Sequence, residues 1–326
     1  MTTFRQIAAA ACAAMCALAC GAAQAQQYPN RPIRVIVPYA AGGAADITAR
    51  MVTQKMGESM GVSFVVDNRG GANGGIGTDV VAKAAPDGYT ILVDASGPVV
   101  VNPVLYTKVP YDPEKDLAPV SLLCSYQYVL VVRNDSPITS LKDLIAKAKE
   151  KPGALSFGST GVGGGNHLAG VLLGLRTGTK LTHVPYKGSA LALADLLGGQ
   201  LSFMYDTIVT SAPHIKSGKL RPFAVSSNKR SSSLPDVPTM EEAGVKDFNI
   251  SQFQGMLVPA KTDPAIIARL HDEAVKALKD PNVFKHLGPD GGNEIVGGTP
   301  AEFARQIKSD LSLYGKLIKQ ANVKVD

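Results

Sequence analysis

Residues 33–46 have the sequence IRVIVPYAAGGAAD, and the expected architecture follows from them. Four of the first five residues are β-branched, which favours a strand, and Pro38 ends that strand. Gly42-Gly43 then precede a helical pattern that runs from about Ala45 to Met60. A strand that passes through a glycine turn into a helix predicts an α/β protein.

The same alternation continues along the chain. A short helix ends near Ala84, and a segment made irregular by its prolines is expected between Gly97 and Pro119. Further strands are predicted at residues 64–66, 90–93, 128–132, 155–157, 182–184, 201–205, 221–225 and 252–258, and further helices at 140–149, 165–175, 189–197 and 211–217 and from Asp263-Pro264 and Thr299-Pro300. This order predicts sheets with helices on both faces and a ligand site in the loops at the carboxyl ends of strands.

The N-terminus has the features of an export signal. Residues 7–19 are almost entirely apolar, but a bilayer span needs about 20 such residues. Ala23-Gln24-Ala25 supplies a small-x-small site, so residues 1–25 are predicted to be a signal peptide that is cleaved after Ala25. Cleavage before Cys20, with lipidation of that cysteine, is the alternative. The predicted location is the periplasm.

Composition and charge exclude several classes of protein. At 326 residues and 45% hydrophobic residues, the chain is long enough for two domains and too apolar to be disordered. A net charge of +6, without basic stretches interleaved with aromatics, predicts no nucleic-acid partner. Three of the four cysteines lie in the predicted signal peptide, so no intrachain disulfide is expected in the mature protein. Cys124 lies in an apolar run and is predicted to be a buried small hydrophobe.

The loop after the first strand is the first candidate for binding. Its glycines allow backbone amides to face a ligand, and the N-terminus of the following helix adds about half a positive charge. A carboxylate or phosphate could therefore bind there without a lysine or arginine. The candidate residues are Tyr39, Ala40, Ala41, Gly42, Gly43 and Asp46. The alternative is a tight turn in which Asp46 is only a first-turn charge favoured by the helix dipole.

A second glycine-rich loop, residues 158–167, also joins a strand to a helix. Ser159, Thr160 and Gly161 belong to a stretch whose main-chain amides could surround an anion. The loop matches neither a P-loop nor G-x-G-x-x-G, so no nucleotide cofactor is predicted. His167 is interpreted as a helix-start residue bonded to a neighbouring carbonyl in preference to a ligand contact. A third loop, residues 70–77, is explained by close backbone packing as well as by binding.

Signatures of catalysis and of metal binding are missing from the sequence. It contains no G-x-S-x-G, H-E-x-x-H or C-x-x-C motif, and its five histidines do not have the spacing of metal ligands. We therefore predict a binding protein without catalytic residues, metal or cofactor.

Taken together, the motifs make the chain recognisable. It resembles the Bug-type extracytoplasmic solute receptors of tripartite tricarboxylate transporters over nearly all of the mature chain. The resemblance rests on an ordered set of elements, each weak alone: Tyr28-Pro29-Asn30-Arg31-Pro32-Ile33, Val37-Pro38-Tyr39 with Gly42-Gly43 and Asp46, Asp67-Asn68-Arg69, Pro86-Asp87-Gly88-Tyr89-Thr90, Ser159-Thr160-Gly161-Val162-Gly163 with His167-Leu168, His183-Val184-Pro185-Tyr186-Lys187-Gly188, Asp195-Leu196-Leu197-Gly198-Gly199 and Leu234-Pro235-Asp236-Val237-Pro238.

The resemblance implies a two-lobed, type II periplasmic-binding-protein (Venus-flytrap) fold, each lobe a mixed sheet flanked by helices. Lobe 1 would comprise residues 26–126 and 249–326, and lobe 2 residues 127–248. The lobes would close on a small organic acid, such as a dicarboxylic acid, for delivery to membrane permease subunits. The implied ligand contacts are the first loop with Asp46, Ser159 to Gly161, and further pocket walls at Ser96, Gly97, Tyr205 and Asp206.

The chain also departs from the family pattern. Ala41 and Gly70 replace usual prolines, Gly164 stands where Ser or Thr is common, and Val171 where an acidic residue is frequent. The missing hydroxyl at position 164 leaves Thr160 as the expected donor of the second loop. Two alternatives stay open: a sensory receptor that signals through a membrane partner, and a secreted α/β hydrolase with Ser159 or Ser96 as nucleophile and His167 or His183 as base.

Overall fold

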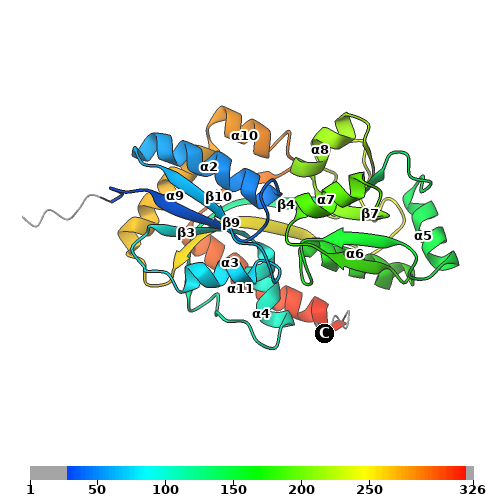
Figure 1. The fold of residues 1–326 in the computed structure, drawn as a ribbon, viewed down its shortest axis with the longest axis horizontal. Helices are drawn as coiled ribbons and strands as arrows, with labels where there is room; N and C mark the ends of the chain where they lie inside the picture. Colours follow the sequence, from blue (N-terminus) through cyan, green and yellow to red (C-terminus); the bar gives the residue numbers. More distant parts are fainter. Residues whose placement is uncertain (1–27, 321–326) are drawn as a thin grey trace, which may run out of the picture.

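The computed structural model describes residues 28–320, so the predicted cleavage site at Ala25 and the alternative at Cys20 lie outside the described residues. Strands and helices alternate through most of the chain (Figure 1). In chain order they are β1 (Ile33–Val37), α2 (Ala44–Met60), β2 (Phe64–Asn68), α3 (Gly75–Ala82), β3 (Thr90–Ala95), η1 (Gly97–Val101), α4 (Asn102–Leu105), β4 (Leu117–Arg133), α5 (Leu141–Glu150), β5 (Ser156–Ser159), α6 (Gly165–Thr177), β6 (Thr182–Pro185), α7 (Ser189–Leu197), β7 (Phe203–Thr207), α8 (Ile208–Lys216), β8 (Leu220–Val225), β9 (Ser251–Pro259), α9 (Pro264–Leu278), α10 (Pro281–Leu287), β10 (Glu294–Gly298) and α11 (Pro300–Gln320).

Two groups of strands form the two lobes. In lobe 1 the strand order is β2-β1-β3-β9-β4, with β10 also paired to β4; β1 is parallel to β2 and β3, and β9 is antiparallel to β3. In lobe 2 the order is β4-β7-β5-β6, with β8 also paired to β4. The sequence predicts α/β sheets flanked by helices, and the structure confirms this fold class.

Strand β4 belongs to both lobes. Its first part pairs with β9 from Leu117 to Gln127, and its second part pairs with β7 and β8 from Tyr128 to Arg133. The strand predicted at residues 128–132 was therefore too short, because β4 has 17 residues. A second crossing lies beside it, where Ser226 exchanges main-chain hydrogen bonds with Tyr128 and Ile250 (2.8 Å).

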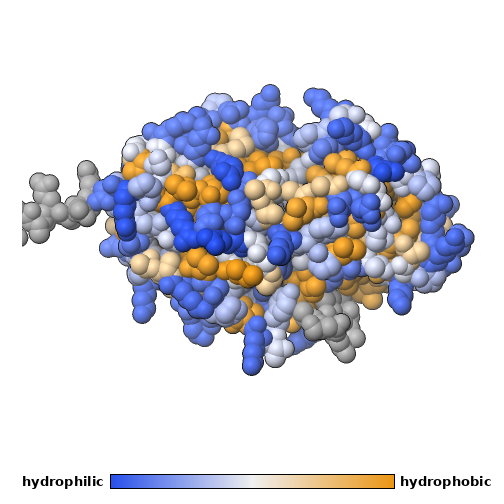
Figure 2. Space-filling model, in the orientation of Figure 1, coloured by the Kyte–Doolittle hydropathy of each residue, from blue (hydrophilic) through white to orange (hydrophobic). Residues whose placement is uncertain are grey.

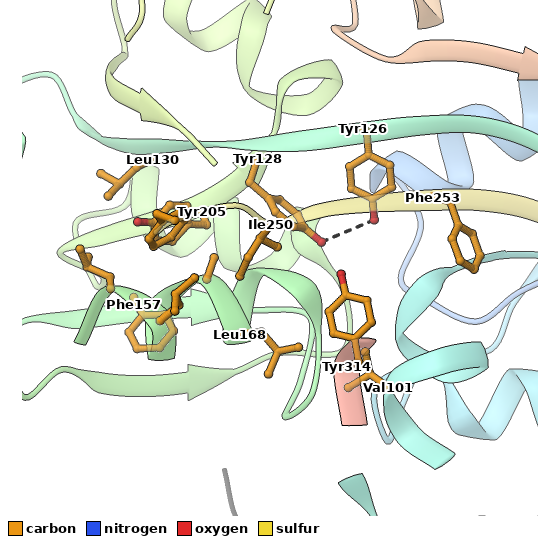
Figure 3. Packing of buried hydrophobic residues seen from close by; sticks show 14 of the residues in the cluster. Val101, Tyr126, Tyr128, Leu130, Phe157, Leu168, Tyr205, Ile250, Phe253 and Tyr314 are labelled. Carbon is orange, nitrogen blue, oxygen red and sulfur yellow. Dashed lines mark hydrogen bonds between the residues drawn. The ribbon is translucent and has the colours of Figure 1, made fainter. Parts of the chain in front are cut away.

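Helices cover both faces of each sheet, as alternating burial requires. Val35 of β1 packs in a core cluster with α2, α9 and α10, whereas its neighbour Ile36 packs with α3 and α11. In lobe 2, Val131 faces α7 and α8, and Leu130 faces α5 and α6. One core cluster continues from lobe 1 into lobe 2, and Figure 3 shows Phe253, Tyr126, Tyr128, Leu130 and Phe157 within it.

Some local expectations are corrected by the structure, and one is confirmed. The predicted irregular segment between Gly97 and Pro119 contains two helical stretches, η1 and α4, and the first residues of β4. Helix α10 and strand β10 were not predicted, because each is short and β10 forms only by pairing with β4. Cys124 is fully buried, as predicted.

Within residues 28–320, every helix is too short or too polar to cross a membrane. Figure 2 shows hydrophilic residues over both lobes, with apolar residues between them, as is usual for a folded domain surface.

Candidate functional site

A cavity lies between the two lobes, where the carboxyl ends of several strands meet. Its non-protein space, its opening to solvent included, is about 470 Å³. Its walls come from both lobes and from the β4 and β9 strands that join them. The lining residues are Tyr39, Gly43, Ala44, Ala45, Ala95, Gly97, Tyr126, Tyr128, Thr160, Gly164, Gly165, Asn166, Ser189, Thr207, Gln252 and Gln254.

Four helices begin at this cavity. Helix α2 starts after Gly43 in lobe 1, and α6 starts after Gly164 in lobe 2. Ser189 is the first residue of α7, and Thr207 is the N-cap of α8. The first N–H groups of a helix have no intrahelical acceptor, and each helix start carries about half a positive charge. Four helix N-termini therefore make the cavity favourable for an anion.

The charge of the lining itself is zero. Of the described residues that line the cavity, none is Asp, Glu, Lys, Arg or His. Two carboxyl groups lie just outside it, at the ends of β3 and β7. Burial raises the pKa of Asp94 well above its usual range, and it raises the pKa of Asp206 to about 6. No carboxylate in the lining itself therefore faces the positive ends of the helix dipoles.

Glycines let the backbone approach the cavity closely. A Cβ atom at Gly165 would lie 2.5 Å from the Tyr128 hydroxyl and 2.6 Å from Cδ of Gln252. A Cβ at Gly164 would lie 2.4 Å from Oγ1 of Thr160, and one at Gly43 would lie 2.9 Å from Oγ of Ser189. Side chains at these three positions would displace neighbouring atoms, so the glycines keep main-chain groups as the surface of the cavity.

The two lobes touch on both sides of the cavity. The Ala40 amide of lobe 1 donates to the Lys187 carbonyl of lobe 2 at 2.9 Å. On the other side, the Tyr106 hydroxyl donates to the Val162 carbonyl, also at 2.9 Å. The structure is therefore that of closed lobes.

The predicted residues of the first loop lie at different depths. Tyr39 and Gly43 line the cavity, whereas Ala41 and Gly42 are exposed and the amide of Ala40 is used in the contact between the lobes. Ala44 and Ala45, the first two residues of α2, line the cavity in addition, although the prediction included only their neighbours Gly43 and Asp46.

Asp46 is held inside its own lobe. Its carboxylate accepts hydrogen bonds from the Gly42 amide (2.9 Å), Arg50 (3.0 Å) and Asn68 (3.0 Å). Burial alone would raise the pKa of Asp46, but these hydrogen bonds outweigh it and hold the pKa below its usual value. Asp46 does not line the cavity, and its bonds fix the loop that does.

The predicted residues of the second loop are also divided. Thr160 lines the cavity, and its amide and hydroxyl both donate to Oδ1 of Asn166 at 3.2 Å. Ser159 is fully buried and Gly161 lies against Asn73 of lobe 1. Nδ1 of His167 accepts a hydrogen bond from the Gly163 amide (3.1 Å), so the ring is a fixed part of the loop and bonds an amide, where a carbonyl was expected.

Of the remaining predicted wall residues, one lines the cavity and three are buried behind its lining. Gly97 lines it, but Ser96 is buried beside it and accepts a hydrogen bond from the Phe253 amide at 2.8 Å. Tyr205 is buried in the core, and Asp206 accepts bonds from Thr210 (2.8 Å) and Ser211 (2.6 Å). The cavity is reached by the next residue, Thr207, because β7 continues two residues beyond its predicted end.

Sequence reasoning missed two kinds of lining residue. Ser189 and Thr207 stand at helix starts, a position that a cap-forming residue after a strand could have indicated. Tyr126, Tyr128, Gln252 and Gln254 alternate along β4 and β9, which indicates a shared face but not which face is the cavity.

Behind the second loop, the rings of two histidines lie against each other at an angle of 40°. The ring centroids of His167 and His183 are 4.1 Å apart, and Nε2 of His183 lies 2.5 Å from the Ser159 hydroxyl. Burial lowers the pKa of His183 to about 4, and burial together with the neighbouring His183 lowers that of His167 to about 3. Ser159 does not line the cavity, and among the described residues no carboxylate accepts a bond from His183, so a serine–histidine nucleophile would not face a solute.

The lowered pKa values of these two histidines predict that the protein loses stability in acid. The unfolded chain protonates a histidine near its ordinary pKa of 6.5, whereas folded His183 stays neutral down to about pH 4. The unfolded state thus binds more protons between these values, and the free energy of unfolding falls as the pH drops through this window. Urea denaturation at pH 7 and at pH 5 measures this effect. Between these two pH values, we expect the free energy of unfolding of wild type to fall by about 1 kcal/mol more than that of His183→Gln. If wild type and His183→Gln differ in their free energy of unfolding by the same amount at both pH values, this account is contradicted.

Comparison with known proteins agrees with this geometry. The family model described as the tripartite tricarboxylate transporter family receptor matches residues 48–323. A UPF0065 protein from the tcbD–tcbE intergenic region of Pseudomonas sp. strain P51 is 39% identical over 96% of this chain and 93% of its own length. Protein BugT of Bordetella pertussis is 37% identical over 92% of each chain.

Solved structures show the same fold. The periplasmic binding protein BugD is 35% identical, with a TM-score of 0.87 over 91% of this chain and 99% of its own. MatC of Rhodopseudomonas palustris with bound malate is 30% identical, with a TM-score of 0.85 over 89% and 100%. An R. palustris protein with adipate is 33% identical, with a TM-score of 0.87 over 91% and 99%.

Proposed function

The chain belongs to the tripartite tricarboxylate transporter receptor family, and from this premise we propose that it captures a small carboxylate between its two lobes in the periplasm. The observation that carries the proposal is the uncharged cavity at which four helices begin. Helix N-termini bind carboxylates through main-chain amides, which leave no charged side chain in the wall.

Two relatives support the class of ligand. One is solved with malate and another with adipate, and both ligands are carboxylates. In the present chain, the α2 start in lobe 1 and the α6 start in lobe 2 would hold the anion from opposite sides. A ligand held in this way stabilises the closed lobes, because it contacts both of them.

The family also supports the cellular role. We propose that the protein is exported by residues 1–25 and delivers its solute to the membrane permease of a tripartite transporter, with no chemistry of its own. The two adjacent histidines, His167 and His183, would then contribute to the packing of lobe 2. A sensory role through a membrane partner would use the same closed form.

Isothermal titration calorimetry with succinate, glutarate, malate, adipate, citrate and benzoate tests this function. We expect saturable binding of at least one carboxylate, and no binding of sugars or of cationic amines of similar size. Binding of only sugars or amines would overturn the anion site. The bound solute should be recovered unchanged; turnover of an ester or amide that Ser159→Ala abolishes would instead favour the hydrolase.

A further inference from the structure

The wall that joins the two lobes carries a pair of glutamines on one face of β9. Gln252 and Gln254 are two residues apart, so their side chains share a face of the strand about 7 Å apart. Both are almost completely buried, at 4% and 2% exposed, and both line the cavity. Neither glutamine contributes to the enclosed side-chain atoms that lack a hydrogen-bond partner, so an end of either amide that is not bonded to protein is open to the cavity.

The orientation of the Gln252 amide is fixed by Tyr314. The Tyr314 hydroxyl donates its hydrogen to the Ser251 carbonyl at 2.8 Å, so toward Gln252 it acts as an acceptor. Nε2 of Gln252 donates to it in a short hydrogen bond. The other end of the amide, Oε1, has no hydrogen-bond partner among residues 28–320, so Gln252 offers the cavity an acceptor.

The orientation of Gln254 is the reverse. The Cys124 thiol, opposite it on β4, donates to Oε1 of Gln254 at 3.7 Å. Burial raises the pKa of Cys124 to about 12, so the thiol keeps its hydrogen. Nε2 of Gln254 has no acceptor in the part of the chain that the structure describes. Gln254 therefore offers the cavity a donor.

Uncharged hydroxyl groups surround this pair. Figure 3 shows the hydroxyls of Tyr126, Tyr128 and Tyr314 turned toward one another, and those of Tyr126 and Tyr128 are 3.5 Å apart. Burial raises the pKa of all three well above the physiological range. The wall between the lobes is thus polar but uncharged, and it presents both acceptors and donors.

We propose that Gln252 and Gln254 select a ligand that carries, besides its carboxylate, a neutral group that both donates and accepts hydrogen bonds, such as a carboxamide. A carboxamide satisfies both glutamines: its N–H donates to Gln252 and its oxygen accepts from Gln254. A second carboxylate satisfies only Gln254 and places its other oxygen against the Gln252 acceptor, which leaves a buried acceptor unpaired. This inference rests on the proposed function, because the carboxylate itself is held at the helix N-termini.

The test compares isosteric ligands that differ only in this group. Glutarate and its half-amide glutaramate, and succinate and succinamate, are titrated by calorimetry into wild type and into Gln252→Met, Gln254→Met and Tyr314→Phe. We expect wild type to bind each half-amide about tenfold more tightly than the diacid, since sites built to bond an amide reject analogues that cannot pair with it. Each of the three variants should bring this ratio close to one.

Tyr314→Phe tests whether the preference for half-amides depends on the orientation of the Gln252 amide and not only on its presence. Tyr314 positions the Gln252 amide through its hydroxyl, so its loss should let the amide rotate and should reduce the ratio although both glutamines remain. Gln54→Met, on the exposed face of α2, is the matched control and should leave the ratio unchanged.

The outcomes are distinguishable from those of the proposed function. If wild type binds diacids and half-amides equally, or if the ratio survives in Gln252→Met and Gln254→Met, the selection by the glutamines is overturned while the carboxylate receptor stands. If wild type binds no carboxylate of either kind, both proposals fail. Melting temperatures of all variants are measured first, and a variant that does not fold is replaced in the comparison by the remaining two.

Discussion

Ser189→Asp should weaken carboxylate binding at least about 100-fold without loss of stability. Ser189 is the first residue of α7, and its hydroxyl lies 2.9 Å from the position that a Cβ atom of Gly43 would occupy. A carboxylate on residue 189 would therefore enter the cavity beside the α2 start and meet the amides that hold the ligand. Two like charges about 4 Å apart at a partly buried site repel by about 4 kcal/mol, so the affinity should fall at least about 100-fold.

The same change should leave the fold intact or stabilise it. Acidic residues in the first turn of a helix are favoured by the dipole, and the new carboxylate would act as a built-in anion between α7 and α2. We expect the melting temperature of Ser189→Asp to equal or exceed that of wild type. Calorimetry and thermal denaturation on the same samples measure both effects.

Two control variants separate charge from position. Ala265→Asp places an acid in the first turn of α9, where the side chain is exposed and far from the cavity, and it should not change the affinity. Ser189→Ala removes the hydroxyl without adding charge and should change affinity by much less than the aspartate. If Ser189→Asp binds carboxylates as tightly as wild type, the cavity is not the anion site.

Ser226→Ala should have the largest effect on stability. The Ser226 hydroxyl accepts from the Tyr128 amide at 2.9 Å and donates to the Ile250 carbonyl at 2.7 Å. It thus links β4 to the second crossing segment between the lobes. Alanine would leave a buried N–H and a buried carbonyl unpaired, which costs about 3 kcal/mol.

Urea denaturation measures this loss. Ser217→Ala, in which the serine is exposed and makes one bond to the His214 carbonyl, is the control and should change the free energy of unfolding by less than about 0.5 kcal/mol. A loss for Ser226→Ala as small as that of the control would show that the hydroxyl does not hold the two crossings together.

The parts of the fold that could be predicted are those whose signals lie within a few residues in the sequence. The boundaries of α2 and α7 follow from glycines and cap positions beside apolar runs, which are visible within a few residues. The length of β4 could not be predicted in this way. Its first part contains Pro119 and polar residues, and it becomes a strand because β9, far away in the chain, pairs with it.

The candidate site likewise contains residues that local sequence indicates and residues that only the tertiary structure brings to the cavity. Tyr39, Gly43 and Thr160 lie in glycine-rich segments between a strand and a helix, and Gly97 is the first residue of η1, just after β3. These signals are local, and the structure places all four residues around the cavity. Gln252 and Gln254 face it only because β9 pairs with β4, which joins residues as distant as Cys124 and Gln254, 130 positions apart. Hydrogen-bond partners of Asp46, such as Asn68, are likewise set by tertiary structure, so the sequence alone left its role open.

The most direct test of the central claim, that main-chain amides at converging helix starts hold a carboxylate, is an NMR titration of the ¹⁵N-labelled protein. We predict that the amide resonances of Gly43 in lobe 1 and Gly165 in lobe 2 shift together with one saturation curve as the best carboxylate from the calorimetric panel is added. Saturable binding in which these two amides stay unchanged, while resonances elsewhere shift, would contradict it.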